Sequence, residues 1–251
     1  MDNKLEEKLL IAKAQDTAFL CEKQNCIKAT GFLTPSEREI VRKNITKNPV
    51  KTCFCGGYED AERTMFVALP DYLEETDALD LISAIEISGR DVGSLRHPDF
   101  LGSLLGLGIK REKIGDIIVL EDRCIVFVAE NIGAYIVENL TKVGRHGVKV
   151  RLIPNEMLEI PLRKVETMSH TVSALRLDSV VSAATKTSRS IAAGYIAEGR
   201  VFVNWMQTEN VSLKIKPGDV FSVRGQGRFR LLEEIRETKK GRIGIQIEKF
   251  I

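Results

Sequence analysis

The most constraining feature of this 251-residue sequence is a series of short, well-marked elements between residues 176 and 230. Four apolar residues have the i, i+3, i+4, i+7 spacing that gives a short helix one buried face: Leu177, Val180, Val181 and Ala184. A second apolar set follows an interruption at residues 187–188 and ends at Gly199: Ile191, Ala192, Tyr195 and Ile196. The segment predicts two short helices joined by a tight turn.

A small sheet is expected directly after this helix pair. Residues 201–204 read as a strand, Pro217-Gly218-Asp219 is typical of a turn, and residues 220–224 read as another strand. Two glycines then stand between Arg224 and Arg228. The predicted order is therefore helix, helix, strand, turn and strand.

Positive charge is concentrated in the same segment. Residues 176–230 hold nine Lys or Arg and four Asp or Glu, a balance of +5, whereas the whole chain carries +2, which leaves −3 for the rest. Such a local excess is the electrostatic footprint of a polyanion site. A solvated basic face without a partner remains the alternative.

This arrangement resembles the S4 domain, and four strings in the right order carry the resemblance: Arg176-Leu177-Asp178, Ser188-Arg189-Ser190, Gly199-Arg200-Val201-Phe202-Val203-Asn204 and Pro217-Gly218-Asp219-Val220. The resemblance implies a two-helix turn on a small β-sheet, with the basic surface of the helices against structured RNA. Guanidinium groups pair two phosphate oxygens at once, and double-helical RNA is read mainly by shape, phosphates and 2′-hydroxyls. We expect the RNA contacts to come mainly from Arg176, Lys186, Arg189, Arg200, Arg224 and Arg228.

Two polar residues of these strings have two readings each. Ser188 and Asn204 can donate to phosphates, or they can cap a helix and turn the backbone. Asp178 is expected to pair with a nearby arginine. Leu177, Val181, Ile196 and Val203 are expected in the core.

The first segment, residues 1–50, is expected to be helical. Five apolar residues recur at roughly helical spacing: Leu5, Leu9, Ala12, Phe19 and Leu20. A second helix is announced by Thr34, Pro35 and Glu37, which fit the cap, first and third positions of a capping box.

The middle segment, residues 51–155, alternates strand and helix signals. Strands are predicted at 64–69, 79–87 and 148–153, the second of which also suits a short helix, and a hairpin is predicted from 116–120 and 124–129. Helices are predicted from His97 to Leu105 and over 131–143. The pattern favours an α+β sandwich with helices on one face of a sheet.

Prolines 154 and 161 and the polar stretch to Ser169 indicate a linker. The expected organisation is α+β throughout: an N-terminal helical segment (1–50), a middle α/β sandwich (51–155), an S4 domain (170–240) and a terminal strand (241–251).

Most of the chain also resembles the YlmH proteins of Gram-positive bacteria. The resemblance rests on Phe54-Cys-Gly-Gly-Tyr58, on the string from His97 to Asp116, and on Val203-Asn204-Trp205 with residues 223–229. It implies a non-catalytic, RNA-binding protein without cofactor or small-molecule substrate. Members associate with the large ribosomal subunit and are linked to rescue of stalled nascent-chain complexes, so the implied partners are rRNA and tRNA. A cytoplasmic monomer is expected, without membrane contact.

A glycine-rich string in the middle segment has its own chemistry. Gly102, Gly106 and Gly108 precede Lys110 and Arg111, a combination that can place backbone and cations against phosphate. The string lacks the Gly-Lys-Ser/Thr ending of a nucleotide-binding loop. We favour an RNA-backbone contact by Lys110 and Arg111, and the alternative is a helix-to-strand packing joint.

Two rival functions remain open. An S4 domain also accompanies RNA-modifying enzymes such as pseudouridine synthases, but we find no nucleotide or methyl-donor signature, and the three histidines stand apart from any nucleophile. The other rival is an interaction protein of cell division. A metal site is disfavoured because the five cysteines lack the usual Cys-x2-Cys spacing. No catalytic or metal-binding residue is therefore predicted.

Overall fold

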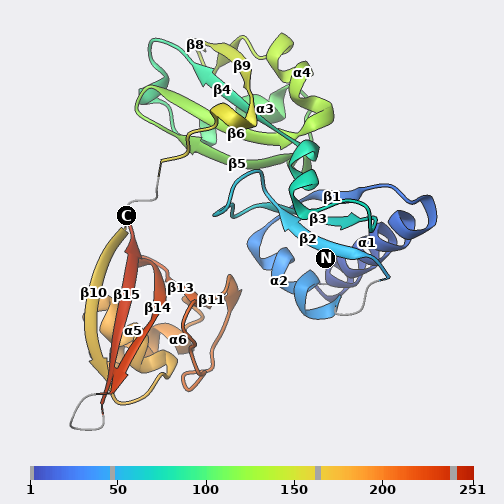
Figure 1. Cartoon of the computed structure of the whole chain (residues 1–251). Helices are drawn as coiled ribbons and strands as arrows, with labels where there is room; N and C mark the ends of the chain where they lie inside the picture. The colour runs from blue at the N-terminus through green and yellow to red at the C-terminus, as the bar shows by residue number, and fades with distance from the viewer. Residues whose placement is uncertain (1–2, 46–48, 162–164, 238–241) are drawn as a thin grey trace. The chain divides into compact units, whose positions relative to one another are not determined.

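The computed structural model describes residues 3–45, 49–161, 165–237 and 242–251. It divides into two compact units, Met1–Glu159 and Ile160–Ile251 (Figure 1). Both mix helices with antiparallel sheets, which confirms the predicted α+β class. None of the helices among the described residues is long and apolar enough to cross a membrane.

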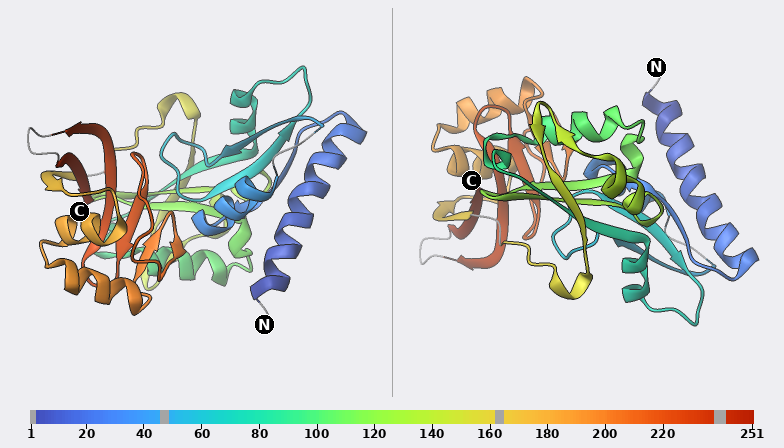
Figure 2. Two further views of the ribbon diagram at one scale, coloured as in Figure 1. Left: turned by 90° about the horizontal axis from the view of Figure 1, so that it is seen from below. Right: turned by 90° about the horizontal axis from the view of Figure 1, so that it is seen from above.

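The first unit begins with a small layer of helices and strands. Its elements are α1 (Asn3–Gln24), β1 (Lys28–Leu33), α2 (Pro35–Asn44), β2 (Lys51–Cys55) and β3 (Thr64–Leu69). The strands form an antiparallel sheet in the order β1-β3-β2, and α1 packs against β1 and β3 (Figure 2). The predicted capping box of α2 is present, with the Thr34 amide donating to the Glu37 carboxylate at 2.6 Å.

Two features of this layer differ from the sequence reading. The segment 1–50, expected to be helical, contains strand β1, because pairing with the fully buried β3 outweighs local preference. The apolar set used to predict α1 is also not its packed face: Leu5, Leu9 and Phe19 are more than half exposed. The helix packs through small residues on its opposite side, Ala14, Ala18 and Cys21.

A larger sheet follows in the same unit. Its elements are β4 (Ile82–Ser88), α3 (His97–Gly106), β5 (Ile114–Val119), β6 (Arg123–Ala129), α4 (Glu130–Asn139), β7 (Lys142–Val143), β8 (His146–Gly147) and β9 (Lys149–Ile153), with short 3-10 turns η1 (Glu75–Leu81), η2 (Val92–Ser94), η3 (Arg111–Lys113) and η4 (Asn155–Met157). The strand order is β5-β6-β4-β9, while β7 and β8 form a separate hairpin.

This sheet confirms the predicted hairpin of β5 and β6 and the helix from His97. The stretch 79–87 proves to be the end of η1 followed by β4. The helix predicted to run to Val143 ends at Asn139, whose side-chain amide donates to the carbonyl of Tyr135 at 2.8 Å. The chain turns after this residue and continues into β7.

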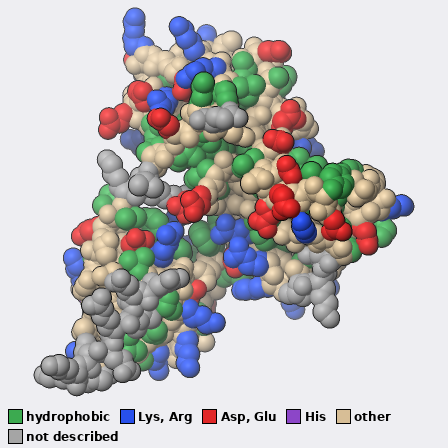
Figure 3. Space-filling model, in the orientation of Figure 1, with side chains coloured by type: hydrophobic (Ala, Val, Ile, Leu, Met, Phe, Trp, Pro, Cys, Tyr) green, Lys and Arg blue, Asp and Glu red, His purple; other side chains and the backbone are tan. Residues whose placement is uncertain are grey.

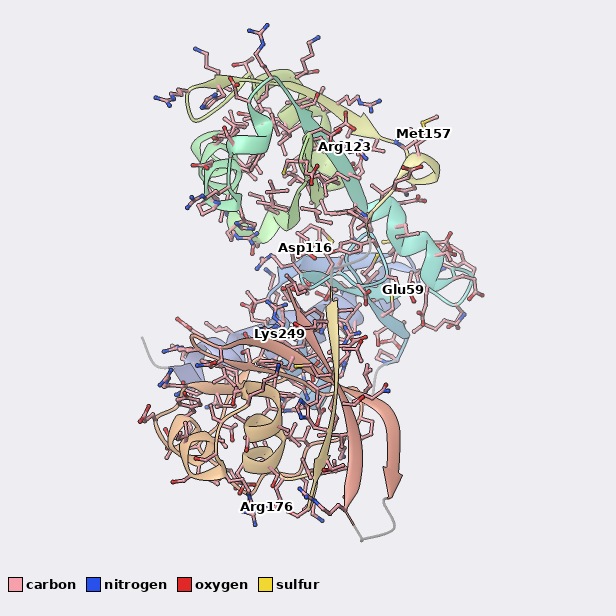
Figure 4. The ribbon with its side chains drawn as sticks, turned by 90° about the vertical axis from the view of Figure 1, so that its left-hand side faces the viewer. Glu59, Asp116, Arg123, Met157, Arg176 and Lys249 are labelled. Carbon is pink, nitrogen blue, oxygen red and sulfur yellow. The ribbon has the colours of Figure 1, made fainter. Side chains whose placement is uncertain are left out.

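Asp116 in β5 connects the two sheets of the first unit (Figure 4). One carboxylate oxygen accepts from the Tyr58 hydroxyl at 2.8 Å and the Glu62 amide at 2.7 Å, and the other accepts from the Arg63 amide at 3.0 Å. The ring of Tyr58 stacks on buried Phe127 of β6 at 4.9 Å between centroids. Hydrogen bonds to Asp116 and the contact between Tyr58 and Phe127 therefore both help to join the two sheets of the unit.

The second unit consists of β10 (Val165–Val172), α5 (Leu177–Thr185), α6 (Arg189–Ala197), β11 (Val201–Val203), β12 (Met206–Gln207), β13 (Val220–Val223), β14 (Gly227–Glu237) and β15 (Ile243–Phe250). They build a six-stranded sheet in the order β10-β15-β14-β13-β11-β12. The interpretation of residues 165–169 as linker is wrong, because they begin β10, which pairs with β15 along its length.

Alternation in these strands explains the packing of the second unit. Phe221 and Val223 of β13, and Phe229 and Leu231 of β14, point to one face and are buried. The buried stripes of α5 and α6 pack into the same core. Leu177, Val181 and Ile196 are fully buried, as predicted, whereas Val203 is only partly buried.

Candidate nucleic-acid interface

Two arginines, one at the start of α5 and one at the start of α6, surround a buried carboxylate. Asp178 is 5% exposed, and it accepts from Arg189 of α6 at 2.5 Å and from Arg176 at 3.2 Å. Burial raises the pKa of Asp178, but the two guanidinium partners outweigh it, so the pKa lies below its usual value. The predicted pairing of Asp178 with an arginine is confirmed. Arg176 and Arg189 each keep about half of their side chain exposed.

The turn between α5 and α6 presents Lys186. This residue ends α5 in the left-handed conformation, with φ of 55°, and it is exposed. Ser188 caps α6, since its hydroxyl accepts from the Ile191 amide at 3.3 Å. Of the two readings of Ser188, the structure shows the cap. The turn thus carries an exposed cation three residues before Arg189, whereas Arg176 lies at the opposite end of α5 (Arg176 is labelled in Figure 4).

Arg200, just before β11, contacts Arg224, just after β13. The Arg200 side chain donates to the carbonyl of Arg224 at 3.0 Å, and its guanidinium carbon lies 4.4 Å from the ring centre of Tyr195. The Arg224 guanidinium lies 5.1 Å from the ring of Phe202. Arg200 is thus partly used in fastening the unit, whereas Arg224 is exposed.

Arg228 belongs to the open face of the sheet. It lies opposite Ser222 of β13 and Phe250 of β15, and its guanidinium is 5.8 Å from the Phe250 ring. Arg230 is 5.3 Å from the same ring and pairs with Glu248 at 3.8 Å. The structure therefore separates the predicted cations into a helix-pair group and a sheet group.

The Asn204 side chain stabilises the turn in which it lies. Its side chain donates to Asp219 at 2.8 Å and accepts from the Val220 amide at 3.0 Å, so both of its polar atoms have partners within the unit. Of the two readings of Asn204, the turn-forming role is the one seen here.

Two further cations lie beside the helix pair. Lys214 and Lys216 are exposed in the loop before β13. The loop is attached to the start of α5 through the backbone. The Leu177 amide donates to the carbonyl of Leu213 at 2.8 Å, and Arg176 and Lys214 form an isolated antiparallel β-bridge. Both lysines add to the local positive charge, but they are not among the RNA contacts predicted from the sequence, because the β-bridge joins residues 38 positions apart in the chain.

In the first unit, Lys110 and Arg111 have different surroundings. Lys110 is exposed. The Arg111 side chain donates to the carbonyl of Ile114 at 2.5 Å, and burial, together with nearby Arg63, lowers its pKa to about 10. The turn η3 that carries Arg111 packs against β1. A packing role for this string is therefore visible, alongside an accessible Lys110.

Other exposed cations gather around the β7–β8 hairpin. They are Arg90, Arg96, Lys142, Arg145 and Lys149. Figure 3 shows Lys and Arg side chains projecting at the end of the unit where β8 and β9 lie. The hairpin is held on α3 by a hydrogen bond from the Gly144 amide to the Ser103 hydroxyl at 3.2 Å. The signal for this cluster is the turn sequence Gly144-Arg145-His146-Gly147, which lies between the helix predicted over 131–143 and the strand predicted over 148–153.

Within the described ranges, no three His, Cys, Asp or Glu side chains lie together as a metal site would require. Among the thiols, burial raises the pKa of Cys53 to about 11 and that of Cys124 to about 12. His146 lies 3.3 Å from Asp91. The chemistry that the surface offers is thus cationic and hydrogen-bond-donating.

Comparisons with known proteins match one family model in each of the two units. Residues 82–157 match the family model described as "Putative RNA-binding domain in YlmH", and residues 175–221 match the S4 domain. The chain is 31% identical over 245 residues to "Ribosome-associated protein quality control protein P2" of Bacillus subtilis (strain 168), which covers 97% of this chain and 95% of that protein.

Among solved structures, "Cell division protein ylmH from Streptococcus pneumoniae" is similar, with a TM-score of 0.51 and 21% identity. The match covers 59% of this chain and 92% of that one, and it shows a shared fold.

Proposed function

The chain belongs to the YlmH family, and on that premise we propose that it binds structured RNA of the large ribosomal subunit without catalysing a reaction. The proposal places it in quality control of stalled nascent-chain complexes, with rRNA and tRNA as partners, and in the cytoplasm as a monomer. The similarity to a Bacillus subtilis protein named for ribosome-associated quality control supports this assignment.

The observation that carries the proposal is the arrangement around Asp178. A single buried carboxylate orients Arg176 and Arg189, while Lys186, Lys214 and Lys216 are exposed on the adjoining turn and loop. Oriented guanidinium groups lose little conformational entropy on binding phosphate, which favours a folded RNA of matching shape over a flexible strand. Arg224 and Arg228 extend the set of cations.

We propose the β7–β8 cluster as the RNA contact of the first unit. Five exposed cations lie there on elements fastened to α3 and β4. Lys110 is a further candidate in this unit, and the exposed part of Arg111 another.

Crosslinking in living cells tests this function. A tagged chain is crosslinked to RNA by ultraviolet light, and the crosslinked nucleotides are mapped by sequencing. We expect enrichment in large-subunit rRNA and in tRNA, with crosslinked peptides from residues 176–228. Crosslinks spread over messenger RNA in proportion to abundance would contradict the assignment.

A further inference from the structure

The β11–β12 hairpin has an unusual turn. Its two turn residues, Asn204 and Trp205, both have positive φ angles, 47° and 62°. A two-residue hairpin turn of this kind favours Asn followed by Gly, because the second position has the left-handed conformation that crowds a side chain. A tryptophan at the second turn position therefore lowers the folding stability of the hairpin relative to glycine.

The surrounding structure holds this turn in place. The Asn204 amide donates to the carbonyl of Val220 at 2.7 Å, and its side chain joins Asp219 at 2.8 Å. The other oxygen of Asp219 accepts from the Lys216 amide at 2.7 Å. The conformation is therefore fixed from outside the hairpin, and Trp205 is presented at its tip despite the cost. Sparsely populated conformations that persist in this way concentrate at functional sites.

The segments linked to the Trp205 turn carry apolar and cationic side chains. Trp205 keeps part of its surface accessible, and the adjacent Met206 is 38% exposed. Lys214 and Lys216 are exposed on the loop that Asp219 ties to the hairpin, and this loop also pairs with the start of α5 beside Arg176. Asp219, which links the loop to the hairpin, has both carboxylate oxygens in hydrogen bonds.

We propose that Trp205 is a base-stacking residue, whose indole ring covers an unpaired nucleobase of the RNA held by the neighbouring cations. The inference rests on the proposed function and adds a partner feature to it: an unstacked base next to a structured phosphate backbone. An indole is a large flat surface that every base can stack on, and bases in RNA loops and bulges are available for it. A tryptophan on a hairpin that is linked to a lysine-bearing loop suits a nucleotide better than an apolar peptide.

Trp205 is the one tryptophan in the sequence, so its fluorescence reports on this position alone. Purified protein is titrated with large-subunit rRNA at low salt, with excitation at the red edge of indole absorption. The proposal expects the emission to fall as RNA binds. Binding that is detected by sedimentation but leaves the emission unchanged would overturn it.

The variant Trp205→Gly gives the second test. We expect its Tm to equal or exceed that of the natural chain, because glycine removes the left-handed penalty, while its affinity for rRNA falls by about tenfold or more. Trp205→Phe should keep part of the affinity. The matched control is Asn25→Gly in the first unit, another positive-φ residue at 48°, for which rRNA affinity should not change.

The outcomes separate this inference from the proposed function. If Trp205→Gly binds rRNA as tightly as the natural chain, the stacking role is wrong and the proposed function stands. If Trp205→Gly loses stability, the ring is a packing group, and this also contradicts the inference. If the natural chain does not bind rRNA, both fall.

Discussion

Asp178 and Arg189 stand on different helices and meet at 2.5 Å, so that one buried carboxylate fixes the angle at which α6 presents its first residue. The same carboxylate holds Arg176. This geometry turns a basic segment into an oriented surface. Under the proposed function, folding stability and RNA binding both depend in part on Asp178.

Replacing Asp178 with asparagine should cost about 1–3 kcal/mol of unfolding free energy at neutral pH, because hydrogen bonds to a charged group are lost at a buried position. The pKa of Asp178 is lowered in the folded chain, so its stabilising effect is present above the unfolded pKa of about 4 and is lost as the pH falls through the folded value. Denaturant unfolding at several pH values measures this. A difference between the two chains that stays constant down to pH 2 would show that the ion pair contributes nothing.

The salt dependence of RNA binding should identify phosphate contacts. Each lost phosphate contact reduces the magnitude of the slope of log affinity against log salt by about 0.7–0.9, so Lys214→Ala should make the slope shallower by nearly one unit. Filter binding of structured rRNA over a range of potassium chloride concentrations gives the slope. Lys8→Ala on α1 removes the same charge from an exposed site in the first unit and serves as the control. Equal slopes for both variants would show that Lys214 does not contact an RNA phosphate.

Asp116→Ala should weaken the first unit and leave the second unchanged. The substitution leaves two backbone amides and the Tyr58 hydroxyl without their acceptor, which costs about 1–3 kcal/mol. Hydrogen exchange read by mass spectrometry should show faster exchange in β3 and β5 and no change in α5 or β13. Equal acceleration in both units would mean that Asp116 supports more than the joint described here.

The β7–β8 cluster should contribute to RNA affinity without contributing to stability. Lys142→Glu combined with Arg145→Glu reverses two exposed charges on a short hairpin. We expect weaker binding to rRNA at moderate salt and a Tm within about 2 °C of the natural chain, as is usual for surface substitutions. Unchanged affinity would restrict RNA contact to the second unit.

The sequence was most informative where spacing and capping agree. The helix pair, the cap at Ser188 and the β5–β6 hairpin follow from local patterns. The sequence segments that resemble YlmH proteins indicated the correct family. Strand β1 and strand β10 were not predicted, because each is stabilised by a partner far along the chain. The apolar set of α1 was misleading, since small residues form its packed face.

The residue types of the candidate site could be predicted from the sequence, but their arrangement in space could not. Residue type and charge pointed to the arginines, but the sharing of Asp178 by two of them depends on the angle between α5 and α6. Charge reversal at Arg189 would therefore set a carboxylate beside a buried one and disturb folding. Lys186 and Lys214 are the better probes, since both are exposed.

Co-sedimentation with ribosomal subunits tests the central claim most directly. The natural chain, Lys186→Glu with Lys214→Glu, and the charge-matched control Lys4→Glu with Lys8→Glu are each centrifuged with separated subunits through a density gradient. The account predicts that the natural chain and the control travel with the large subunit, whereas the first variant remains at the top with an unchanged Tm. Equal recovery of all three chains with the large subunit, or none with it for the natural chain, would contradict the account.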